Sequence, residues 1–62
     1  MYLKLRAKRV EKGLTQRDLA KLLNLAPCNY NKKEKGKVDF KLEEVKEILK
    51  ILDSNFDDIF LN

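Results

Sequence analysis

The fold is decided by the stretch from Thr15 to Lys37, which reads T-Q-R-D-L-A-K-L-L-N-L-A-P-C-N-Y-N-K-K-E-K-G-K. Thr15 is a favoured N-cap residue, and Asp18, three positions later, can complete a capping box and place a negative charge at the positive end of the helix dipole. Apolar residues then recur at helical spacing, which predicts a first short helix over 16–23. The residues with this spacing are Leu19, Leu22 and Leu23.

A tight turn and a second helix follow. Asn24 interrupts the apolar pattern, and Asn is the non-glycine residue best suited to a left-handed turn. Leu25 is apolar within that turn, so we expect it to point inward. Pro27 suits the first position of a helix, and Gly36 suits the position just after one, which predicts a helix over 27–34.

The two faces of the helix over 27–34 differ in character. At about 100° per residue, Tyr30 and Glu34 share one face, while Cys28 and Lys32 lie on the opposite face. A helix that turns an aromatic ring inward and short polar and basic groups outward is suited to presenting those groups. Two eight-residue helices around an Asn-centred turn match the helix-turn-helix unit.

These residues resemble a known family, the phage-repressor and Cro-like (C1-type) helix-turn-helix domains, also called the XRE family. The resemblance covers about residues 5–36, and the tail over 55–60 is similar to the family's last helix. It implies an all-α, compact, five-helix, lambda-repressor-like fold and a transcription regulator of phage-repressor type. Two departures, Asn24 in place of the usual Gly and Pro27-Cys28 in place of base-reading Gln, bear on the target sequence rather than the fold. The matching residues are Arg9, Gly13-Leu14-Thr15-Gln16, Leu19-Ala20, Leu25, Tyr30, Glu34 and Gly36.

The rest of the sequence predicts three further helices. One is expected over 2–12, with Tyr2, Leu5, Arg9 and Val10 on its apolar side. Another is expected over 42–52, with an apolar stripe made of Leu42, Val45, Ile48, Leu49 and Leu52. A last short helix is expected after an Asn55 cap, and the loop before 42 is expected to tuck Val38 and Phe40 under it. Residues 1–62 are therefore interpreted as one domain.

Charge is distributed unevenly along the chain. The 62 residues carry a net charge of +4, but residues 1–37 carry +8 and residues 38–62 carry −4. A basic half that also contains the presented helix is typical of a nucleic-acid-binding surface. Solubility alone would explain the 39% of charged residues but not their segregation.

The composition argues against other classes of function. One Cys and no His leave no internal disulfide, no zinc site and no general base of the usual kind, so we expect no enzyme, no metal and no cofactor. The longest apolar runs are three residues, so no membrane span is expected. The plain interpretation is a cytoplasmic protein.

Arg9 is a charge within an otherwise apolar stripe, and it needs a partner if it is buried. Glu34, on the inward face of the helix over 27–34, is the best candidate, and the family resemblance implies the same ion pair. The alternative is that Arg9 extends out to solvent along its stem.

DNA binding is the leading hypothesis, with the helix over 27–34 in the major groove. The base-reading candidates are Cys28, Asn29 and Lys32, with Pro27 and Asn31 at the margin. Gln16, Lys35 and Lys37 are expected to meet phosphates, and Arg17 adds diffuse attraction. Lys33 is expected to be a solvated residue that complements the helix dipole.

The expected partner is double-stranded DNA with a two-fold operator, bound by a homodimer. Phe60 and Leu61, with parts of the helix over 42–52, are the candidate dimer surface, although they could equally be core. A second hypothesis is a protein-interaction module, such as an antitoxin that grips a basic partner through its acidic C-terminal half. A third, non-specific nucleic-acid or RNA binding, is weakened by the lack of exposed aromatic residues in the basic half.

Overall fold

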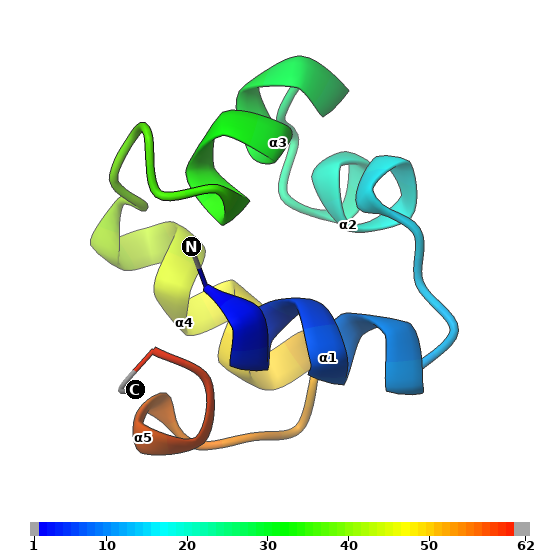
Figure 1. Ribbon diagram of the computed structural model, residues 1–62, viewed down its shortest axis with the longest axis vertical. Coiled ribbons are helices and arrows are strands. Elements are labelled where there is room, and N and C mark those ends of the chain that lie inside the picture. The colour runs from blue at the N-terminus through cyan, green and yellow to red at the C-terminus, as the bar shows by residue number, and fades with distance from the viewer. Residues whose placement is uncertain (1, 61–62) are drawn as a thin grey trace.

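The computed structural model describes residues 2–60, and these form the five helices that the sequence predicts. They are α1 (Leu3–Glu11), α2 (Gln16–Leu22), α3 (Pro27–Glu34), α4 (Leu42–Ile51) and α5 (Phe56–Ile59). The all-α fold is confirmed: no strand occurs in residues 2–60, and α2 packs against α3 while α1 packs against α5 (Figure 1). None of these helices is long and apolar enough to cross a membrane.

Helices α1 to α4 all end in the same way. The residue after each C-cap has a positive φ, and those residues are Gly13, Asn24, Gly36 and Asp53. In each case the next residue donates its N–H back to a carbonyl five residues earlier, as Leu25 does to Ala20 at 2.8 Å. This is the Schellman motif, and it confirms that Asn24, with φ of 58°, makes the left-handed turn between α2 and α3.

The core has two parts that share a boundary. Leu5, Ile48, Leu52 and Ile59 join α1, α4 and α5, and Leu19, Ala20 and Tyr30 join α2 to α3. Three half-buried residues, Leu23, Phe40 and Ile51, pack against both parts. The helix pair α2–α3 therefore packs against the rest of the domain through apolar contacts.

The aromatic side chains form one connected cluster. Phe40 lies 6.2 Å from Tyr30, 5.6 Å from Tyr2 and 5.7 Å from Phe60, measured between ring centroids. Phe56 stacks on Phe60 at 5.2 Å. Tilted and offset pairs at these separations are favourable arrangements, so the loop before α4 is held down by Phe40.

Several apolar residues expected inside are instead exposed. Leu42 is 70% exposed because it is the first residue of α4, whereas the core contacts of this helix and its C-cap are made by Ile48, Leu49, Ile51 and Leu52. Leu22 and Val10 each occupy the last turn of a helix on its solvent side, and Val38 lies in an open loop. In the last helix, Asn55 occupies the N-cap position but makes no side-chain capping bond.

Candidate nucleic-acid interface

Helix α3 has the two faces that the spacing predicts. Tyr30 is fully buried and Glu34 is 3% exposed, whereas Cys28 and Lys32 lie on the exposed side. Pro27 occupies the first helical position and is exposed, as is Asn29. The exposed side chains of α3 thus form one surface, which we call the α3 outer face: Pro27, Cys28, Asn29 and Lys32.

Helix α2 begins with the predicted capping box. The Thr15 Oγ1 atom accepts from the Asp18 N–H at 3.0 Å, and the Asp18 Oδ2 atom accepts from the Thr15 N–H at 3.0 Å. The hydrogen bond from the Thr15 N–H is the main cause that holds the pKa of Asp18 below its usual value. The backbone N–H groups of Gln16 and Arg17 lie in the same first turn, where free amides favour an anion such as a phosphate.

The predicted ion pair between Arg9 and Glu34 is present and buried. The Arg9 Nε atom donates to Glu34 Oε2 at 3.1 Å, and Nη2 donates to Oε1 at 3.2 Å. The remaining Arg9 nitrogen, Nη1, donates to the Leu14 carbonyl at 2.8 Å. The Arg9 side chain is only 8% exposed, so the alternative in which Arg9 extends out to solvent is wrong.

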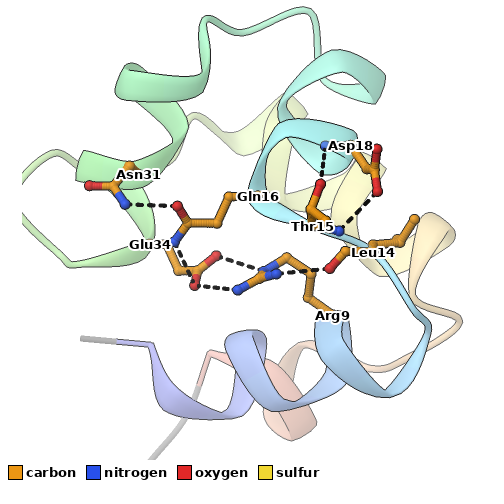
Figure 2. A network of polar contacts seen from close by, with 7 residues as sticks. All are labelled: Arg9, Leu14, Thr15, Gln16, Asp18, Asn31 and Glu34. Atoms are coloured by element: carbon orange, nitrogen blue, oxygen red, sulfur yellow. Dashed lines mark hydrogen bonds and ion pairs between the residues drawn. The ribbon is translucent and has the colours of Figure 1, made fainter.

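The ion pair is one end of a longer polar network, shown in Figure 2. The Asn31 Nδ2 atom donates to Gln16 Oε1 at 2.8 Å, and the Gln16 Nε2 atom donates to Glu34 Oε1 at 3.4 Å. A chain of hydrogen bonds therefore links Asn31 of α3 to Gln16 of α2, Gln16 to Glu34 of α3, and Glu34 to Arg9 of α1. Both Gln16 and Asn31 are half-buried, which places Asn31 beside α2 rather than on the α3 outer face.

The hydroxyl group of Tyr30 lies in an unusual environment. It is buried and has no hydrogen-bond partner among residues 2–60. Burial raises the pKa of Tyr30 well above its usual range, and the neighbouring Glu34 carboxylate raises it further. The hydroxyl therefore stays protonated and Tyr30 acts as a core residue.

Lys33 does not behave as the sequence predicted. Its Nζ atom donates to the two carboxylate oxygens of Glu44 at 2.6 and 2.8 Å, and the side chains are only 9% and 11% exposed. Lys33 is thus a buried partner of α4 and not a solvated helix end. Local sequence patterns did not reveal this pair, because neither Lys33 nor Glu44 interrupts an apolar stripe in the way that Arg9 does.

Basic groups remain exposed around the α3 outer face. Lys35 and Lys37 flank Gly36 just beyond α3, and Arg17 is exposed at the start of α2. The acids nearby are engaged, since Glu34 is paired with Arg9 and Asp18 caps α2. No group of acidic, Cys or His side chains in residues 2–60 is arranged to hold a metal ion.

Comparisons with known proteins give the same picture. The sequence profile of the helix-turn-helix family matches residues 5–59. Two crystal structures of the clp gene regulator ClgR from Corynebacterium glutamicum superpose with TM-scores of 0.78 and 0.74, at 27% identity over 89% of this chain. The chain spans 58% of the length of the first of these and 71% of the second. No curated protein sequence matches it.

The family match covers almost the whole described chain, and the fold places a capped α2, an Asn24 turn and an outward-facing α3 where such a domain requires them. The matched family comprises DNA-binding regulators and not enzymes. The chain therefore belongs to the XRE-type helix-turn-helix family of DNA-binding domains.

Proposed function

We propose that this domain is a transcription regulator that reads double-stranded DNA with α3 in the major groove and α2 across the backbone. The observation that carries the proposal is the α3 outer face. Its polar and basic side chains are exposed, while the opposite side of the same helix is fixed by Tyr30 and Glu34. A helix held on one side and exposed on the other presents its side chains in a defined register.

Sequence readout is assigned to three members of the α3 outer face. Asn29 can bond an adenine through two hydrogen bonds, and Lys32 can reach the O6 and N7 atoms of guanine. Cys28 is small enough to lie against a thymine methyl group. Pro27 lies at the margin of this surface. The side-chain amide nitrogen of Asn31 is bonded to Gln16, and its side-chain oxygen makes no hydrogen bond within residues 2–60.

Contacts with the DNA phosphates are assigned to residues near both ends of α3. Gln16 and Arg17 lie in the first turn of α2, where the amides and the helix dipole favour a phosphate. Lys35 and Lys37 lie beyond the opposite end of α3 and are exposed. These contacts orient the domain without specifying a sequence.

A single domain of this size covers one half-site, so we propose a homodimer on a two-fold operator, as in Cro-like repressors of phage type. The similar protein ClgR is a gene regulator, which supports the regulatory part of this proposal. The expected cytoplasmic location and the single-domain extent over 1–62 belong to the same proposal.

Selection from a random pool of duplex DNA tests the function. The expected result is an enriched motif with two related halves about one helical turn apart. Lys32→Ala, which removes a base-reading candidate, should change the selected motif. Lys46→Ala, which removes an exposed Lys from α4, is the matched control and should select the same motif as the unaltered protein. A pool that shows no enrichment would contradict the proposal.

The alternative is a protein-interaction module such as an antitoxin, in which the acidic C-terminal half binds a basic partner. Part of that acidity is already used within the domain, because Glu44 is bonded to Lys33. The same selection distinguishes the two, since an interaction module would not enrich a motif.

A further inference from the structure

Lys33 and Glu44 form the second ion pair of α3, and their side chains are only 9% and 11% exposed. The Lys33 Nζ atom contacts the two carboxylate oxygens of Glu44. Glu44 Oε1 also accepts from the Lys41 N–H at 2.8 Å, so the carboxylate is fixed to the first turn of α4. The lysine therefore has a partner whose own position is set by the backbone.

Consecutive residues of α3 are thus held by opposite charges from different helices. Lys33 is tied to α4 through Glu44, and Glu34 is tied to α1 through Arg9. Adjacent positions on a helix diverge by about 100°, so a pair of such restraints opposes rotation of α3 in either direction. Apolar contacts of Tyr30 hold the helix in place but specify its rotation less sharply, because they are not directional.

The pair also removes the Lys33 charge from the DNA-binding surface. Burial is the largest influence on the pKa of Glu44 and raises it, but the hydrogen bonds from Lys33 and the Lys41 N–H and the charges of those lysines together lower it below its usual value. The carboxylate is therefore ionised at neutral pH, and it neutralises a lysine that would otherwise add to the attraction for phosphate.

We propose that Glu44 is a positioning residue for DNA recognition: through Lys33 it sets the rotation of α3 about its axis, and hence which side chains of the α3 outer face reach base edges. The proposal rests on the proposed function. It differs from two simpler roles, a contribution to stability alone and a direct contact of Lys33 with phosphate.

The test compares Glu44→Gln with Glu47→Gln, which removes the same charge from an exposed position on the same helix. Affinity is measured for the selected site and for random DNA over several salt concentrations, at temperatures where each variant is fully folded. For Glu44→Gln we expect the ratio of the two affinities to fall by roughly tenfold, the discrimination carried by one good base contact. The salt slope should steepen, because the Lys33 charge is no longer neutralised. Glu47→Gln should leave both quantities unchanged.

A second variant covers the case in which Glu44→Gln does not fold. Lys33→Met combined with Glu44→Leu replaces the pair with apolar groups and strands no charge, so stability should be retained. Discrimination should still fall, because the directional restraint is gone. A folded variant of either kind with full discrimination would overturn the proposal.

Lys33→Met alone separates positioning from phosphate contact. If Lys33 touched phosphate, this change would weaken binding to random DNA and lower the salt slope by about one per half-site, and the proposal would be wrong. We expect neither change.

The orientation of α3 in the free protein provides a readout that needs no DNA. Residual dipolar couplings of the α3 amides, compared with those of α4, should change in Glu44→Gln and not in Glu47→Gln. An unaltered orientation would overturn the positioning role. Failure of the unaltered protein to select a motif would instead overturn the proposed function.

Discussion

At the scale of single residues, Glu34 is the point where the polar contacts of three helices converge. Its carboxylate accepts from Arg9 at both oxygens and from Gln16 at one. Because Gln16 also accepts from Asn31, the side chains that lie nearest the DNA-binding surface are linked to a buried charge. A change at Glu34 is therefore expected to affect both stability and the start of α2.

We expect Glu34→Ala to destabilise the domain by about 3 kcal/mol, because it leaves the Arg9 guanidinium buried and unpaired. In a domain of this size such a loss approaches the whole free energy of unfolding. Thermal and denaturant unfolding measure it. Glu43→Ala, at an exposed position of α4, is the control, and an unaltered melting temperature for Glu34→Ala would show that the pair contributes little.

The pKa of Glu44 predicts how stability depends on pH. The folded-state pKa lies below the ordinary value of 4.5, so the unfolded chain takes up a proton more readily than the folded one. The contribution of Glu44 to the free energy of unfolding is therefore fully present above about pH 4.5, and it is lost as the pH falls through the lower, folded-state pKa. Denaturant midpoints between about pH 7 and pH 3 should fall less steeply for Glu44→Gln than for the unaltered protein, whereas Glu47→Gln should follow the unaltered protein.

At the scale of the helix, contacts with base edges and contacts with phosphates are expected from different lysines in and after α3. Lys32 is exposed on the side opposite Tyr30, so it is placed to touch a base edge, whereas Lys37 follows Gly36 and lies outside the helix. Lys32→Ala should relax specificity by about 1–3 kcal/mol at one position of each half-site. Lys37→Ala should weaken binding to all sequences alike and reduce the salt slope by about one per half-site.

Titrations with specific and random DNA at several salt concentrations distinguish these effects. If Lys32→Ala lowered both affinities equally, Lys32 would be another phosphate contact. Readout would then rest on Cys28 and Asn29, and the rotation of α3 in the groove would differ by part of a turn from the one proposed.

At the scale of the whole molecule, the surface available to a second copy is smaller than the sequence suggested. Phe60 is half-buried in the aromatic cluster, and Leu61 lies outside the described residues. Phe56, which is 46% exposed, and Leu42 remain as exposed apolar groups in the C-terminal half. A dimer formed there would bury side chains that the isolated domain leaves in water.

We predict a weak dimer through this C-terminal half that is strengthened by DNA. Sedimentation at high protein concentration and cooperativity between half-sites are the measurements. Phe56→Ser should reduce both, whereas Leu3→Ser, which alters an exposed residue of α1, should not. A strict monomer that binds half-sites without cooperativity would contradict the prediction.

The sequence by itself determined the local features of this protein. The capping box at Thr15 and Asp18, the left-handed turn at Asn24 and the stop at Gly36 depend on residues close together in the chain, so spacing alone predicts them. Periodicity likewise predicted the inward face of α3. The Arg9–Glu34 pair was predictable because both charges fall on stripes that must face the core.

Only the tertiary structure decided which distant residues meet. The bonds from Lys33 to Glu44 and from Asn31 to Gln16, and the exposure of Leu42, depend on the angles at which the helices cross and on where their contacts end. A residue at the edge of an apolar stripe is buried or exposed according to the neighbour that covers it. No local pattern encodes that neighbour, because helix packing is set by the whole core at once.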